Sequence, residues 1–151
     1  MAVWCPIDIH NPAGITQDDL NALLDPPYVN WMGHQTAMAQ VLTDHNIIVL
    51  PSYREGFPKS LIEACAVGRA IITTDAPGCK ECVIEGYNGF KVPIKDHLLL
   101  AESIEKLIVD GELRKIMGEN SRKFAEENFS IELVIQKTLA LYDRFLETTP
   151  G

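Results

Sequence analysis

Basic side chains are scarce in this sequence of 151 residues. It has 13 lysine and arginine residues against 21 aspartate and glutamate residues, which gives a formal net charge of −8. Nucleic-acid binding relies on clustered basic side chains, so the charge balance argues against that function. A small anionic ligand is compatible with it, because backbone amides in a local pocket can hold a phosphate group on an acidic protein.

Long apolar runs and disulfide patterns are also missing. No apolar segment approaches the roughly 20 residues that are needed to span a bilayer, and the opening MAVWCPIDIH lacks the basic and apolar regions of a signal peptide. Four cysteines, at positions 5, 65, 79 and 82, show no pattern of a secreted disulfide-rich domain. We therefore expect a reducing, cytoplasmic location.

Short apolar runs alternate with helical patterns, which is typical of an α/β fold with a mainly parallel sheet. NIIVL and AIITT are apolar on consecutive positions, as expected of parallel strands that are covered on both faces. No linker or internal repeat interrupts the chain, so we expect a single domain over 1–151. Strands are predicted at 2–5, 28–32, 46–50, 70–74 and 89–92. Helices are predicted at 16–24, 35–45, 59–67, 79–85, 96–109, 111–127 and 130–147.

Two of the helix boundaries have local signals. Thr16 is a candidate N-cap, because the acidic residues Asp18 and Asp19 follow in the first turn. Gly68 stands where a left-handed residue would end the helix over 59–67.

The segment EGFPKSLIE, residues 55–63, is where the local pattern indicates chemistry. It follows a strand and a loop, and its helix begins at about Pro58, where a missing N–H costs no hydrogen bond. In doubly wound folds, ligands bind at this carboxyl edge of the sheet. The free amides of Lys59, Ser60 and Leu61, with the helix dipole behind them, would suit an anion such as a diphosphate.

Glu55 and Glu63 lie at the two ends of this proposed anion site. Carboxylates do not bind phosphate, but each can accept hydrogen bonds from neighbouring sugar hydroxyls. A ligand with a sugar, a diphosphate and a ribose in a row, a nucleotide sugar, would satisfy both. The alternative is structural: Glu63 as a polar helix residue, and Glu55 as a charge near the N-terminus that stabilises the helix by a few tenths of a kcal/mol.

The stretch VLPSYREGFPKSLIEACAVGRAIITTDAPGCKECVIEGYNGFKVP resembles the C-terminal, donor-binding domain of glycosyltransferase family 4, also called group 1. YVNWMGHQ is similar to the strand and loop beneath the nucleotide base, and GYNGFKVPIKD to a closing glycine-rich strand. The resemblance implies the Rossmann-like, three-layer α/β/α C-terminal half of a GT-B fold. It also implies a retaining transferase that needs no cofactor or metal. Within the family, the sequence is most similar to bacterial enzymes of capsule and polysaccharide biosynthesis.

The resemblance assigns roles to individual positions. Glu55 would act at the donor sugar by binding its hydroxyls, and Glu63 would bind the ribose hydroxyls. The backbone around Gly56, Phe57, Lys59 and Ser60 would meet the sugar and the diphosphate, and the loop Gly33-His34-Gln35 would border the base. Pro58 departs from many relatives, which have glycine there and use its N–H group. By the same resemblance the donor is expected to be a UDP-sugar.

The resemblance also marks parts that this chain is expected to lack. Relatives hold the diphosphate with an Arg and a Lys near the first strand of this domain, and they have an N-terminal acceptor domain. We therefore expect a truncated donor domain that is inactive by itself and prone to self-association through uncovered apolar surface. In the full-length parent, the acceptor would be a glycan or a lipid-linked molecule, and the protein would lie in the cytoplasm or peripherally at the membrane. The alternatives are a nucleotide-sugar epimerase of related fold and a non-catalytic nucleotide-sugar-binding module.

Cys79 and Cys82 form a lone CxxC motif. Structural zinc requires four ligands, and the sequence has no second pair at a suitable spacing. We interpret these residues as ordinary thiols, with a metal or redox site as the alternative.

Overall fold

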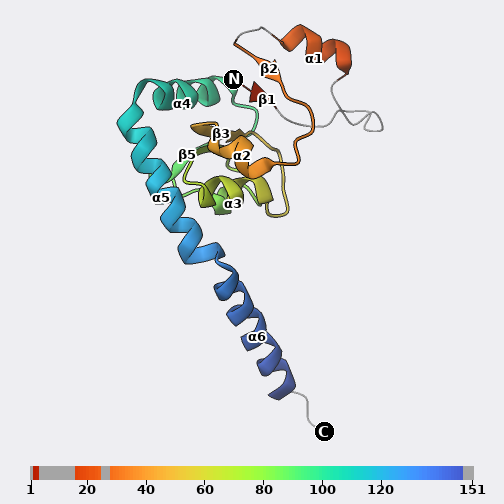
Figure 1. Ribbon diagram of the computed structural model, residues 1–151, viewed down its shortest axis with the longest axis vertical. Coiled ribbons are helices and arrows are strands. Elements are labelled where there is room, and N and C mark those ends of the chain that lie inside the picture. Colours follow the sequence, from red (N-terminus) through yellow and green to blue (C-terminus); the bar gives the residue numbers. More distant parts are fainter. Residues whose placement is uncertain (1, 4–15, 25–27, 148–151) are drawn as a thin grey trace. The chain divides into compact units, whose positions relative to one another are not determined.

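The computed structural model describes residues 2–3, 16–24 and 28–147 (Figure 1). The contacts divide the chain into two compact units, Met1–Val41 and Leu42–Gly151. Helix α2 (Met38–Thr43) spans the boundary between them. Residues 4 and 5 of the first predicted strand, including Cys5, lie outside the described residues.

The described residues of the first unit include a parallel strand pair and helix α1. Strand β1 (Ala2–Val3) pairs with β2 (Asn30–Trp31), and α1 (Gln17–Leu23) lies between them in sequence. Thr16 caps α1 as predicted: its hydroxyl accepts a hydrogen bond from the Asp19 amide at 3.1 Å, and the Asp19 carboxylate accepts one from the Thr16 amide at 2.9 Å. The hydrogen bonds from Thr16 lower the pKa of Asp19.

The second unit is built on a three-stranded parallel sheet. Its strands are β3 (Ile47–Leu50), β4 (Ala70–Thr74) and β5 (Gly89–Val92), in the order β3-β4-β5. Ile47 lies opposite Ala70, and Ile71 lies opposite Gly89. All residues of the central strand β4 are buried, which confirms the prediction from its consecutive apolar positions.

Two helices bury one face of this sheet. Helix α4 (His97–Val109) and helix α5 (Gly111–Phe129) contribute Leu107 and Met117 to a core that they share with Ala70, Ile72 and Val92. Ala70 and Ile72 are two positions apart and therefore point to the same face of β4. Asp96 and Asp110 cap the two helices through their side chains, which accept from amides three residues on, at 3.0 and 2.9 Å.

Helix α3 (Lys59–Ala66) connects β3 to β4 and contacts both strands and α5. It is one residue shorter than predicted. Gly68 adopts the left-handed conformation with φ +69°, as expected of a residue that ends a helix.

The predicted helix over 79–85 was wrong, because only a 3₁₀ turn, Lys80–Cys82, forms there. The buried side chain of Asn88 explains the difference. Its amide nitrogen donates to the Cys82 carbonyl at 3.1 Å, and its oxygen accepts from the Ile84 amide at 2.7 Å. Because Asn88 takes up the backbone groups that a longer helix would need, the segment turns into β5 instead.

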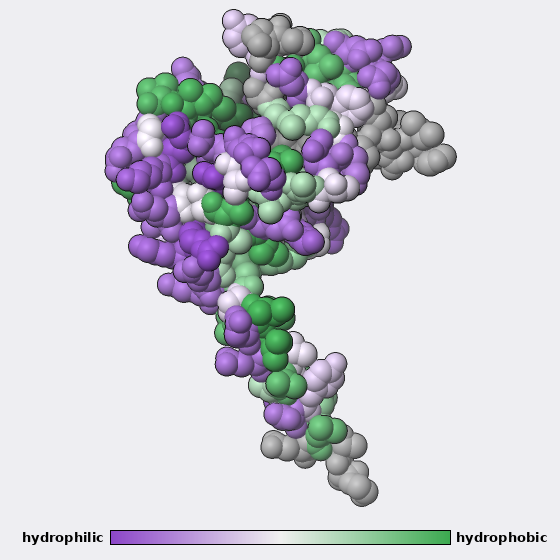
Figure 2. Space-filling view, in the orientation of Figure 1, coloured by the Kyte–Doolittle hydropathy of each residue, from purple (hydrophilic) through white to green (hydrophobic). Residues whose placement is uncertain are grey.

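The last helix, α6 (Ile131–Glu147), contacts α5 and leaves large apolar side chains exposed. Figure 2 shows hydrophobic surface on α6. The exposed apolar side chains are Ile131, Val134, Ile135, Leu139, Leu141, Tyr142, Phe145 and Leu146, and we call them the α6 stripe. None of the helices in the described residues is both long and apolar enough to pass through a membrane.

Replacing Asn88 with alanine should destabilise the chain by about 1–3 kcal/mol, because it leaves buried backbone groups without partners. Urea unfolding followed by circular dichroism measures this loss. Asn128→Ala is the matched control: Asn128 is exposed on α5, and its loss should change the stability by less than about 0.5 kcal/mol. Equal effects of the two substitutions would contradict the role of Asn88.

Candidate functional site

The predicted site lies at the carboxyl edge of the β3-β4-β5 sheet. The loop 51–58 follows β3, and the loop 75–79 follows β4, so the parallel strands bring both loops to the same edge. The end of β4 holds the first of these loops. The Thr73 hydroxyl donates to the Leu50 carbonyl at 2.8 Å, and the Thr74 hydroxyl donates to the Ser52 carbonyl.

Glu55 is anchored by its backbone. Its amide donates to the Pro77 carbonyl at 3.0 Å, across the two loops. Glu55 is half-buried, whereas Gly56 and Phe57 are exposed. The Phe57 ring meets Phe129, at the end of α5, edge to face with 5.5 Å between ring centroids. The loop with Glu55 is therefore held on one side by the loop after β4 and on the other by the end of α5.

The N-terminus of α3 supplies the amides that the anion hypothesis requires. Pro58 is the N-cap and has no side-chain capping hydrogen bond. Lys59 and Ser60 are the first two helical residues, whose N–H groups have no acceptor within the helix. The expectation of a third free amide was wrong: the Leu61 amide donates to the Pro58 carbonyl at 3.0 Å, because the helix opens with a tight turn.

Glu63 lies on α3, one turn after Lys59. The Lys59 ammonium stands 3.4 Å from the Glu63 carboxylate, and the two side chains are 87% and 34% exposed. Such an exposed i,i+4 pair contributes only a few tenths of a kcal/mol. This contact agrees with the structural alternative, in which Glu63 is an ordinary polar residue of the helix. It is nevertheless weak enough for a bound hydroxyl to displace it.

The remaining predicted residues belong to the first unit. Gly33 has a left-handed φ of +65°, and the Gln35 amide group donates to the Met32 carbonyl, which forms a turn after β2. His34 is exposed in this turn. That this turn borders the same ligand as Glu55 and Glu63 stays a prediction.

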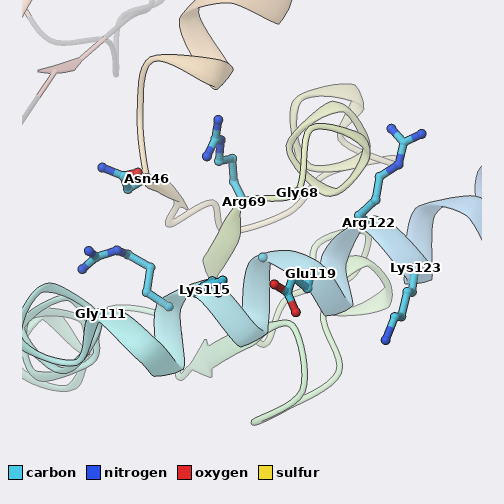
Figure 3. A pocket seen from close by; sticks show the side chains of 10 residues that line it. Asn46, Gly68, Arg69, Gly111, Lys115, Glu119, Arg122 and Lys123 are labelled. Carbon is cyan, nitrogen blue, oxygen red and sulfur yellow. The ribbon is translucent and has the colours of Figure 1, made fainter.

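A basic groove of about 530 Å³ lies at the opposite edge of the sheet, before β3 and β4 begin (Figure 3). The side chains of Arg69, Arg114, Lys115, Arg122 and Lys123 line it. Figure 3 shows that Arg122 and Lys123 point away from each other. Nothing in the sequence indicated this groove, because its residues come from separate segments.

The three arginines of the groove bind carbonyls at the C-terminal ends of helices. Arg69 donates to Leu42 and Thr43 of α2, at 3.1 and 2.8 Å. Arg114 donates to Leu107 of α4 at 2.6 Å, and Arg122 donates to Ala66 of α3. Cations at these positions compensate the negative ends of the helix dipoles. The charge of the groove therefore has a structural explanation.

The cysteines of the second unit are buried and free. Burial raises the pKa of the Cys65 thiol to about 11 and that of Cys82 to about 12. A redox-active cysteine needs a lowered pKa and access from solvent. Cys82 of the CxxC motif is buried and has a raised pKa, which argues against a redox role.

The chain belongs to the glycosyl transferases group 1 family, whose model matches residues 20–124. It is 35% identical over 137 residues to the capsular polysaccharide biosynthesis glycosyltransferase CapM of Staphylococcus aureus, covering 91% of this chain and 36% of that protein. It is also 35% identical over 119 residues to N,N'-diacetylbacillosaminyl-diphospho-undecaprenol alpha-1,3-N-acetylgalactosaminyltransferase of Campylobacter jejuni, covering 79% of this chain and 31% of that protein.

The fold is likewise shared with a solved structure, Anabaena Alr3699/HepE in complex with UDP-glucose. The TM-score is 0.76 at 21% sequence identity, and the match covers 84% of this chain and 35% of that one. These comparisons confirm the predicted family and the Rossmann-like α/β fold of the GT-B type. The chain spans about a third of the length of the proteins it matches.

The buried thiols give a pH-dependent prediction. Because their pKa values are raised above the ordinary 9.0, the folded chain holds these protons more tightly than the unfolded chain does. The stabilisation is complete below about pH 9 and falls as the pH rises toward 11–12. At pH 8, iodoacetamide should leave Cys65 and Cys82 unmodified in the folded chain but modify both in urea, as read by mass spectrometry. Rapid modification of folded Cys82 would contradict this.

Proposed function

We propose that this chain is the donor-binding part of a retaining glycosyltransferase that transfers a sugar from a nucleoside-diphosphate sugar. One observation carries the proposal: the N-terminus of α3 has no side-chain cap and stands between Glu55 and Glu63 at the carboxyl edge of a parallel sheet. The membership in a family of glycosyl transferases supports it. So does the likeness to a protein whose structure contains UDP-glucose.

Each part of the site would have a separate task. The amides of Lys59 and Ser60 would bind the diphosphate, and the positive end of the α3 dipole would stabilise the charge that develops on the leaving nucleoside diphosphate. Glu63 would accept hydrogen bonds from the ribose hydroxyls, and Glu55 would accept them from the donor sugar. Gly56 and Phe57 would line the sugar end, and Gly33, His34 and Gln35 would border the base. In this scheme the site needs no cofactor or metal, and UDP-sugar is the proposed donor.

The names of the relatives support a proposal for the acceptor. Their names include a capsular polysaccharide biosynthesis enzyme and an enzyme whose substrate is linked to diphospho-undecaprenol. We therefore propose a glycan or lipid-linked acceptor, bound by an acceptor domain of the full protein. We also propose a location in the cytoplasm or, for the full protein, peripherally at the membrane. The 151 residues would form one donor domain without transferase activity of its own.

Titration of the chain with UDP, GDP and ADP tests the donor site. Glu63→Ala should weaken binding of the preferred nucleotide by about 1.5–3 kcal/mol, because hydrogen bonds to a charged acceptor are lost. Isothermal titration calorimetry measures this change and identifies the base.

Glu105→Ala is the matched control for this titration. Glu105 is an exposed glutamate of α4 and has no part in the proposed site, so its loss should leave the affinity unchanged. Equal binding by wild type, Glu63→Ala and Glu105→Ala would contradict the role of Glu63, and the absence of binding in wild type would contradict donor binding by this chain.

The α6 stripe supports the proposed self-association of the 151-residue chain. Ile135 and Tyr142 are 51% and 63% exposed, and they lie seven residues apart on one face of α6. An exposed apolar surface of this extent favours association in water.

Sedimentation velocity should show dimers or larger species of the wild-type chain that increase with concentration. The double substitution Ile135→Glu, Tyr142→Glu should shift the chain to monomers, because it places charges in the stripe. The pair Gln136→Glu, Ala140→Glu adds the same charge on the opposite face and should have no effect. A wild-type chain that is monomeric at all concentrations would contradict self-association.

A further inference from the structure

The loop after β4 touches the backbone of Glu55 more closely than any side chain would allow. Gly78 is buried and has a left-handed φ of +87°. A β-carbon at this position would lie 2.7 Å from the carbonyl carbon of Glu55 and 2.7 Å from the carbonyl oxygen of Gly56. Both distances are shorter than van der Waals contact, and both atoms belong to the backbone, which cannot rotate away.

The neighbouring residue completes this contact. The Pro77 carbonyl accepts the hydrogen bond from the Glu55 amide at 3.0 Å. Pro77 and Gly78 thus hold the two sides of one peptide segment: Pro77 fixes the N–H group of Glu55, and Gly78 packs against its C=O group. Only glycine, which has no side chain, fits at position 78.

We propose that Pro77 and Gly78 are positioning residues for Glu55 and thereby set the affinity of the site for the sugar part of the donor. This inference rests on the proposed function, in which Glu55 binds the donor sugar and Glu63 binds the ribose. In this proposal the loop after β4 contacts neither the donor sugar nor the ribose. It acts through the backbone of Glu55, whose displacement by a fraction of an ångström would misdirect the carboxylate.

Because the two glutamates bind different parts of the donor in this proposal, a loss at Glu55 can be distinguished experimentally from a loss at Glu63. Glu63 lies on α3, whose residues Leu61, Ala64 and Cys65 are buried, so its position is fixed by the core. Glu55 lies on a loop that depends on Pro77 and Gly78. A change at Gly78 should therefore weaken binding of the nucleotide sugar and spare binding of the nucleotide, whereas a general loss of stability would weaken both.

Gly78→Ala tests the proposal, with Gly86→Ala as the matched control. Gly86 also has a left-handed φ, +72°, but a β-carbon there meets nothing within 4 Å. Both substitutions carry the same kind of backbone strain, and only Gly78→Ala adds the collision with Glu55. Isothermal titration calorimetry with UDP and with UDP-glucose, and amide hydrogen exchange of Glu55 by NMR, are measured on both variants and on wild type.

We expect Gly78→Ala to weaken UDP-glucose binding by about tenfold or more while UDP affinity changes less than about twofold. The Glu55 amide should exchange slowly in wild type and faster by on the order of tenfold in Gly78→Ala. Gly86→Ala should match wild type in all three measurements.

The inference is overturned if Gly78→Ala leaves the exchange of the Glu55 amide unchanged, or if it accelerates exchange and still spares UDP-glucose binding. If wild type binds neither ligand, the proposed function fails, and the inference about sugar affinity fails with it. The exchange data still decide whether the loop after β4 holds Glu55.

If Gly78→Ala does not fold, Thr74→Val serves instead. It removes the hydroxyl that holds Ser52, at the start of the loop that carries Glu55, and it nearly keeps the side-chain volume. It should lower UDP-glucose affinity selectively, and equal loss of both ligands would overturn the inference.

Discussion

The parallel pairing of β3 with β4 is the constraint on which the rest of the second unit depends. Because the strands run in the same direction, the ends of both lie at one edge, and the loops that follow them must meet there. The contact of Pro77 with Glu55 is a direct result. An antiparallel pairing would have sent these loops to opposite edges and left Glu55 without its anchor. The central strand β4 is buried along its whole length, so the sheet is covered on both faces around this pairing.

The same pairing sorts the helix ends by charge. Helices that connect parallel strands run back across the sheet, so their N-termini gather at the carboxyl edge and their C-termini at the other edge. At the carboxyl edge the N-terminus of α3 is left uncapped by any side chain. At the other edge Arg69, Arg114 and Arg122 bind the C-terminal carbonyls of α2, α4 and α3. Arginines thus compensate the helix C-termini at the other edge, whereas the N-terminus of α3 has no side chain that compensates it.

The sequence predicts those features that depend on neighbouring residues. Consecutive apolar positions located β3 and β4, and the spacing of Thr16 and Asp19 located a helix cap. Features that depend on distant partners were missed. Asn88 stops the helix expected over 79–85 by binding backbone groups from outside it, and the arginines of the basic groove donate to carbonyls 6 to 56 residues away. Local patterns contain no signal for such contacts, because the fold brings the partners together.

In the candidate site, too, the local features were predicted and the contacts with distant segments were missed. EGFPKSLIE was predicted as a site from its own residues, since a strand, a loop and a helix start suffice to indicate an anion-binding edge. The dependence of this loop on DAPG could not be read from the segment, although proline followed by glycine indicates a turn. Glu55 is half-buried in a loop, whereas Glu63 lies on a packed helix. The position of Glu55 is therefore expected to be more sensitive to substitutions in neighbouring segments than that of Glu63. In the proposed function, where Glu55 binds the donor sugar and Glu63 binds the ribose, small changes in the neighbouring loop reposition Glu55, whereas a core helix holds Glu63 in place. Under this proposal, variation at 75–79 would alter the sugar preference and keep the nucleotide.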